Sequence, residues 1–77
     1  MAKRRLKFIF PTELVTEPVL YNLGQDFRVV TNIRRADITE TQGWVVLEME
    51  GSEEDIEKGL AWVEAKGVGV EALESEV

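Results

Sequence analysis

Four segments of this 77-residue chain consist of alternating or β-branched apolar residues, a pattern typical of strands. In the first segment, Leu6, Phe8 and Phe10 share one face, as in a strand that buries one side. In the second, the alternation changes phase near Arg34 and Arg35, which predicts a bulge. The strands are expected over residues 4–10, 28–39, 44–50 and 68–73.

Two segments between these strands carry helix signals. Pro18 suits the first position of a helix, and apolar residues follow at helical spacing to about residue 25. Ser52 can cap a second helix, and the three acidic residues after it suit the first turn of that helix. Gly67 marks its end. The order strand-helix-strand-strand-helix-strand predicts an α+β, ferredoxin-like sandwich in a single domain, residues 1–77, with a four-stranded antiparallel sheet and two helices on one face.

The chain contains no cysteine and no histidine. Thiolate chemistry is therefore excluded, and so are the commonest general base and metal ligand. We expect no catalytic residues, no metal and no cofactor, which favours a binding or regulatory protein over an enzyme. The basic residues at 3–5 precede no apolar run long enough for a signal peptide or a membrane span, so we expect a cytoplasmic protein without membrane insertion.

Helices on one side of the sheet leave the other side, the open face, uncovered. Alternation predicts that the open face carries Ile9, Val30, Trp44 and Val46. Contiguous apolar surface on a small protein usually marks an interface, so we expect a homodimer that packs through Ile9, Trp44 and Val46. The alternative is that these are isolated surface apolar residues, which are common.

Short motifs follow one another in a specific order along the chain. Their residues are Glu17-Pro18-Val19, Asn32-Ile33, Gly43, Glu50-Gly51, Ile56-Glu57-Lys58, Ala61-Trp62-Val63 and the segment 67–73. In this order and spacing they resemble the NIL domain, a family named for an Asn-Ile-Leu tripeptide in its second strand. The resemblance covers about residues 6–73, and Arg34 stands where the family has leucine.

This resemblance implies a bacterial regulatory domain with a ferredoxin-like fold. NIL domains occur at the C-terminus of methionine-importer ABC ATPases and attached to small bacterial ferredoxins. In the importers two such domains pair, and methionine binds between them. The resemblance assigns ligand contact to Asn32 and places the pocket for the ligand side chain near Ile38.

The residue types around Asn32 suit an amino-acid ligand, and the resemblance to the NIL domain implies that this ligand is similar to methionine. The Asn32 amide offers a donor and an acceptor, Arg34 can bind a carboxylate, and Glu48 can accept from an ammonium group. We expect a non-enzymatic sensory domain that binds this ligand at a dimer interface. The expected ligand-binding residues are Asn32, Arg34 and Glu48, with Val30, Ile38 and Val46 lining an apolar slot.

Other interpretations stay open. Asn32 can satisfy backbone groups at a dimer interface, and Arg34 with Glu48 can form an exposed cross-strand pair. The arginine at position 34 favours a second function, an interaction or dimerisation module that docks in trans on a transporter or ferredoxin and has no ligand site. Nucleic acid is not an expected partner, because the net charge is −6 and Trp44 is the one aromatic residue of its strand.

Overall fold

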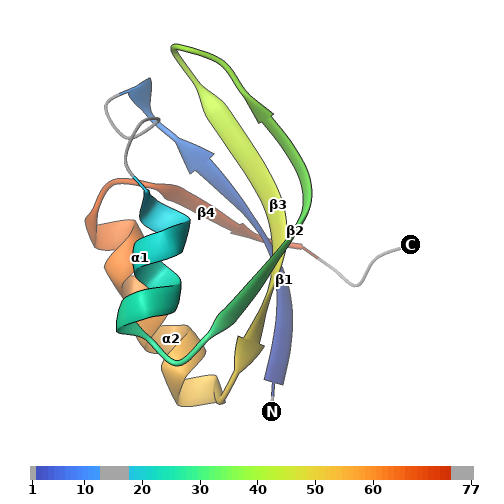
Figure 1. The fold of residues 1–77 in the computed structure, drawn as a ribbon, viewed down its shortest axis with the longest axis vertical. Helices are drawn as coiled ribbons and strands as arrows, with labels where there is room; N and C mark the ends of the chain where they lie inside the picture. Colours follow the sequence, from blue (N-terminus) through green and yellow to red (C-terminus); the bar gives the residue numbers. More distant parts are fainter. Residues whose placement is uncertain (1, 13–17, 74–77) are drawn as a thin grey trace.

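The computed structural model describes residues 2–12 and 18–73; Glu17 of the sequence motif and residues 74–77 lie outside this range. Figure 1 shows both helices on one side of a single sheet, so the predicted α+β arrangement is confirmed. The elements are β1 (Ala2–Phe10), α1 (Val19–Asp26), β2 (Val30–Ile38), β3 (Gly43–Gly51), α2 (Glu53–Ala65) and β4 (Gly69–Ala72).

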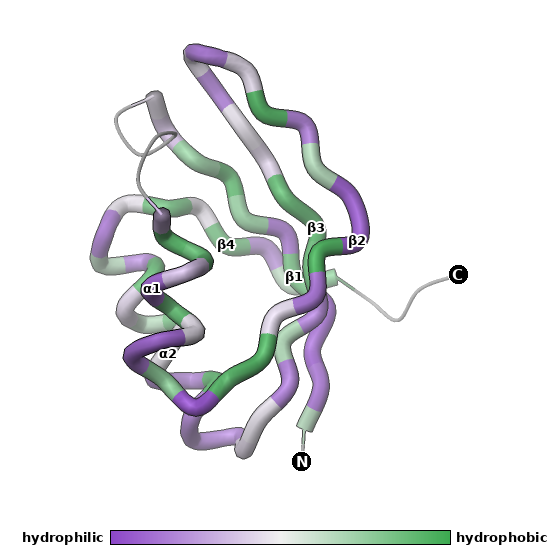
Figure 2. Tube along the Cα trace, viewed as in Figure 1, coloured by the Kyte–Doolittle hydropathy of each residue, from purple (hydrophilic) through white to green (hydrophobic). Residues whose placement is uncertain are grey.

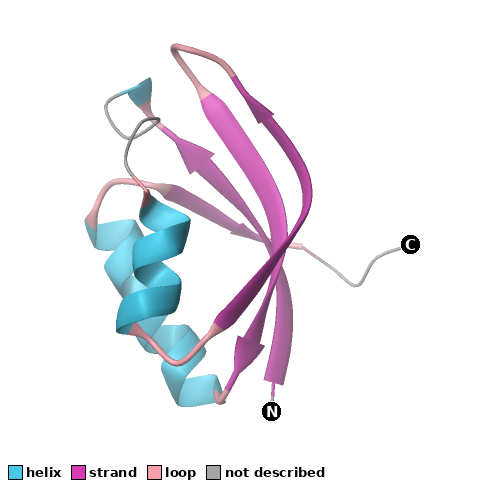
Figure 3. Ribbon diagram, viewed as in Figure 1, coloured by secondary structure: helices cyan, strands magenta, loops and turns pink. Residues whose placement is uncertain are grey.

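The four strands form one antiparallel sheet in the order β2-β3-β1-β4. The central strands β3 and β1 pair along their whole length, from Ala2 opposite Gly51 to Phe10 opposite Gly43. The edge strand β4 is short and pairs only with residues 6–9 of β1. At the other edge, the β2–β3 hairpin extends past the ends of both helices (Figure 3).

The core lies between the helices and one face of the sheet. Each buried strand residue follows the alternation expected from the sequence, and α1 and α2 add the residues on their inner stripes. Gly59 of α2 lets the two helices approach closely, because a Cβ atom there would lie 3.0 Å from Cδ1 of Leu23 on α1. The buried apolar residues are Leu6, Phe8, Phe10, Val19, Leu23, Val29, Val45, Leu47, Met49, Ile56, Val63 and Val68.

Local signals explain where the helices begin and end. The hydroxyl of Ser52 accepts a hydrogen bond from the Asp55 amide at 3.0 Å, as a capping residue does. Gly67 follows α2 with φ 105°, a conformation that favours glycine. Pro18 precedes α1 as its N-cap and is not the first helical residue, so its predicted place was one position too far inside. Neither helix in the described part of the chain is long and apolar enough to span a membrane.

Strand β2 carries the predicted bulge, a register shift between Ile33 and Arg35. Beyond it, Ala36 and Ile38 lie opposite Val45 and Gly43, on the helix side of the sheet. The helices do not cover this part of the sheet, and Ile33 and Ile38 are 56% and 54% exposed. The edge strand is therefore open to solvent on both of its faces.

Candidate functional site

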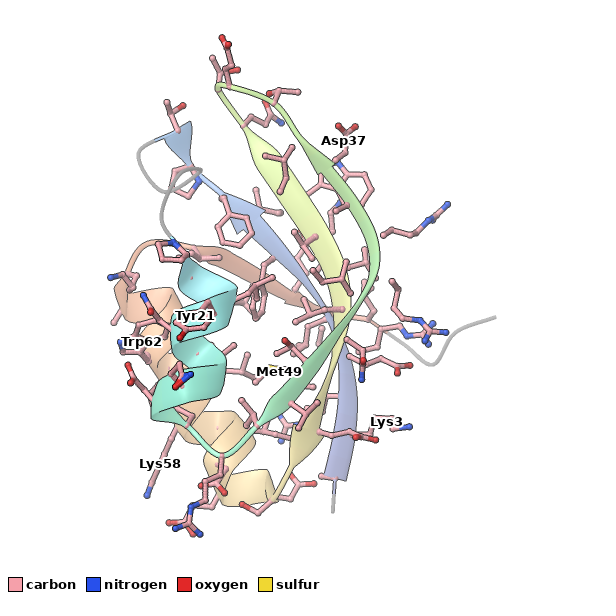
Figure 4. All side chains as sticks on the ribbon, in the orientation of Figure 1. Lys3, Tyr21, Asp37, Met49, Lys58 and Trp62 are labelled. Atoms are coloured by element: carbon pink, nitrogen blue, oxygen red, sulfur yellow. The ribbon has the colours of Figure 1, made fainter. Side chains whose placement is uncertain are left out.

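The open face is organised in rows that run across β2, β3 and β1. Because opposite residues in antiparallel strands point to the same side, the pairing register defines each row. Figure 4 shows Lys3 and Asp37 on this side, away from the helices. From one end of the sheet to the other the rows are Val30–Glu50–Lys3, Asn32–Glu48–Arg5, Arg35–Val46–Lys7 and Asp37–Trp44–Ile9.

Glu48 occupies the middle of the second row and pairs mainly with Arg5. A guanidinium nitrogen of Arg5 donates to Oε2 of Glu48 at 2.5 Å, and the two side chains are only 21% and 17% exposed. The Arg5 hydrogen bond lowers the pKa of Glu48, against the effect of desolvation, and the charge of Arg34 adds to the lowering. Glu48 is thus held as a carboxylate, with Oε2 engaged by Arg5.

Arg34 and Asn32 complete this row on the β2 side. Nη1 of Arg34 lies 4.0 Å from Oε1 of Glu48, and the Arg34 side chain remains 53% exposed. Asn32 is exposed and directly opposite Glu48. The structure therefore brings Asn32, Arg34 and Glu48 together, as the sequence predicted, with Arg5 as a fourth member that the sequence analysis missed. The pairing register, which alternation alone does not give, was the information needed to find Arg5.

Ile38 does not join the other residues of the predicted apolar slot. It lies opposite Gly43, in phase with the buried residues Val45 and Leu47, and therefore on the helix side of the sheet. A Cβ atom on Gly43 would lie 3.1 Å from Cγ1 of Ile38, which confirms that side. The bulge is the physical reason, because one extra residue reverses the faces of the strand that follows it.

The predicted interface residues Ile9, Trp44 and Val46 are contiguous on the open face. Ile9 is directly opposite Trp44, and Val46 follows two residues further along β3. All three are half-buried, and the ammonium group of Lys7 lies 5.2 Å from the centre of the Trp44 ring. The fourth residue, Val30, is separated from this patch by the Asn32–Glu48–Arg5 row.

The most exposed large apolar side chains lie mainly on β2. Figure 2 shows hydrophobic and hydrophilic residues interspersed along this strand. Sequence reasoning missed Ile33 as a surface residue, and the signal available was the short first helix, whose eight residues span less length than the nine of the strand. The four side chains are Tyr21 at 66% exposed, Val30 and Ile33 at 56% and Ile38 at 54%.

A surface depression of about 680 Å³ lies where β4 ends and leaves the first half of β1 uncovered. It reaches the open face at Arg5 and Glu48, and its lining also includes Leu60 and Leu73. Asn32 does not line it. No group of three side chains suited to a metal ion occurs in the described residues.

A comparison with protein families covers all four strands and both helices of this chain. The model of the NIL domain matches residues 4–72, which is nearly the whole chain. The chain belongs to the NIL domain family. No curated protein matches this NIL domain.

Solved structures share the fold of this NIL domain. The C-terminal domain of an ABC transporter ATP-binding protein from Enterococcus faecalis has a TM-score of 0.82 and 18% sequence identity, and the match covers 95% of this chain and 86% of that one. The de novo designed protein Ferredog-Diesel has a TM-score of 0.59 and 15% identity, covering 95% and 85%. At these identities the likeness establishes the ferredoxin-like fold.

Proposed function

We propose that this NIL domain is a non-enzymatic regulatory domain that binds a small amino acid on its open face, where a second copy packs against it. Family membership and the ABC transporter neighbour support a regulatory domain. The observation that carries the ligand proposal is the exposed Asn32 amide in a row with Glu48 and Arg34. This row offers amide, carboxylate and guanidinium groups within one small area.

A second copy is part of the proposal because Asn32 lies exposed on the open face, outside the depression beside it. Ligand sites normally bury most of the ligand surface in a concave pocket. A partner packed on the patch of Ile9, Trp44 and Val46 would close the open face and enclose a ligand beside it. Methionine is the first ligand to test, since the family resemblance points to it.

Titration calorimetry with a panel of common amino acids tests the ligand site. We expect binding to the wild type at millimolar or lower concentration and loss of binding in Asn32→Ala. Asn22→Ala, which makes the same change on α1, is the matched control and keeps wild-type affinity. If no amino acid binds the folded wild type, the ligand proposal is wrong.

A second candidate function, pairing of two copies without a ligand, is favoured by the edge of β2. Beyond the bulge, residues 35–38 pair regularly with β3, while their outer edge has no strand neighbour among the described residues. Arg35 and Asp37 lie two residues apart on the same face. In an antiparallel, two-fold symmetric pair of β2 strands centred on Ala36, Arg35 of each copy would face Asp37 of the other.

Charge exchange tests this edge pairing by sedimentation velocity. Arg35→Asp and Asp37→Arg each place like charges opposite each other, so each variant alone should be monomeric. An equimolar mixture of the two should form a heterodimer, because both contacts then join opposite charges. Lys58→Glu on the outer side of α2 is the control and should behave as the wild type. Single variants that dimerise like the wild type would rule out this edge, whereas dissociation by Val46→Lys alone would support packing through the open face.

A further inference from the structure

Arg34 is the extra residue that the bulge inserts into β2. The register passes from Ile33 opposite Leu47 directly to Arg35 opposite Val46, so Arg34 has no position of its own in the ladder. Its guanidinium group nevertheless reaches the open face, where Nη1 lies 4.0 Å from Oε1 of Glu48, the residue opposite Asn32. The bulge therefore adds a cation to the row that carries the proposed ligand site.

The guanidinium of Arg34 is available to a ligand. Glu48, its neighbour, makes its short hydrogen bond with Arg5, at 2.5 Å, and the contact with Arg34 is longer and more exposed. Exposed ion pairs of this kind contribute little, so a ligand carboxylate can replace the contact at small cost. Arginine also presents two parallel N–H donors that match both oxygens of a carboxylate.

The same region lacks the walls of an apolar slot. Ile38 lies on the opposite face of the sheet, and the leucine expected after Ile33 is Arg34. The remaining apolar candidates, Val30 and Val46, lie in the rows on either side of Asn32 and do not face each other. A ligand side chain that extends from Asn32 along β2 therefore meets a guanidinium group instead of an apolar wall.

We propose that this site selects an amino acid with a carboxylate in its side chain, such as glutamate or aspartate, and that Arg34 is the residue that determines this preference. The proposal rests on the proposed amino-acid site. Asn32 binds the α-amino or α-carboxylate group, and Arg34 binds the side-chain carboxylate. Glu48 keeps its hydrogen bond with Arg5 and gives up its longer contact with Arg34 when the ligand carboxylate binds.

Calorimetric titrations with L-glutamate, L-aspartate and L-methionine test this preference. We expect the wild type to bind an acidic amino acid at least about tenfold more tightly than methionine, as a charge-assisted hydrogen bond allows. Arg34→Leu should reverse the order, and Arg34→Lys should retain part of the acidic preference because it keeps the charge but loses the paired donors. Arg28→Leu, the same change at an exposed residue before β2, is the control and should bind as the wild type.

The outcomes separate this inference from the function on which it rests. If methionine binds the wild type more tightly than either acidic amino acid, and Asn32→Ala abolishes that binding, the site stands and the acidic preference is wrong. Equal affinities of wild type and Arg34→Leu for glutamate and aspartate would also overturn the role of Arg34. Absence of binding by every amino acid in the panel would refute both proposals. Circular dichroism of each variant verifies that it is folded.

Discussion

Ile33 and Leu47 lie directly opposite each other across β2 and β3, on the same side of the sheet, yet Ile33 is 56% exposed and Leu47 is fully buried. The difference arises because the helices cover β3 and stop short of the edge strand. Position in the alternation thus assigns a residue to a face, while the extent of the helical layer decides whether that face is buried. The two residues therefore have different expected contributions to stability.

Substitution of this pair measures that difference. Ile33→Thr should change the free energy of unfolding by less than about 0.5 kcal/mol, as is usual at exposed positions. Leu47→Ala should lower it by about 2–5 kcal/mol, because a buried side chain is removed and a cavity remains. Urea denaturation of both variants provides the values, and similar losses in both would show that β2 is covered on its helix side.

The two glycines within the helices should respond in opposite directions to alanine. Gly24→Ala in α1 should stabilise the protein by about 0.5–1 kcal/mol, because the new Cβ meets no atom within 4 Å and alanine favours the helix. Gly59→Ala in α2 should destabilise it, since overpacking against the buried Leu23 typically costs about 1–3 kcal/mol. Thermal unfolding of the two variants is the measurement, and a gain in both would contradict the close approach of the helices.

The cap of α2 should contribute measurably to stability. Ser52→Ala removes the acceptor of the Asp55 amide and should cost about 1 kcal/mol. Ser52→Asp retains an acceptor and should unfold close to the wild type, which makes it the control for the change of side chain. If both variants lose the same stability, the hydrogen bond is not the cause.

Glu48 should make stability depend on pH in the acidic range. Its pKa is lower in the folded protein, chiefly because of Arg5, so its stabilising effect is complete above the ordinary pKa of about 4.3. The effect is lost as the pH falls from there through the lowered folded-state pKa. Glu48→Gln should therefore show a shallower fall in the free energy of unfolding below about pH 4. Glu54→Gln on α2 is the control, and an equally shallow fall in both variants would assign the effect to total charge.

Much of the fold follows from the order of sequence signals. Alternation at residues 4–10 and 44–50 places Phe8 and Leu47 in the core, and the Ser52 cap marks the start of α2, all as predicted. The change of phase near Arg34 and Arg35 predicted the bulge correctly. These features are local, because each depends only on residues a few positions apart in the sequence.

The candidate site was only partly predictable for the same reason. Asn32, Arg34 and Glu48 share the open face as expected. The short hydrogen bond from Arg5 to Glu48, however, depends on the register of β1 against β3, which is not a local property. The bulge was predicted, and it places Ile38 on the opposite face from Val46. The predicted ligand site nevertheless included both residues. The exposure of β2 depends on helix length and placement, which the alternation of β2 does not encode.

The bulge also determines what a change in the gene would do. Arg35 opposite Val46 already comes directly after Ile33 opposite Leu47, so the ladder on either side of Arg34 has the register of an uninterrupted strand. Loss of the Arg34 codon would therefore remove the bulge and leave Arg35 and Asp37 on the open face and Ile38 on the helix side. A deletion of three nucleotides would thus take away the guanidinium group without exchanging the two surfaces of the hairpin.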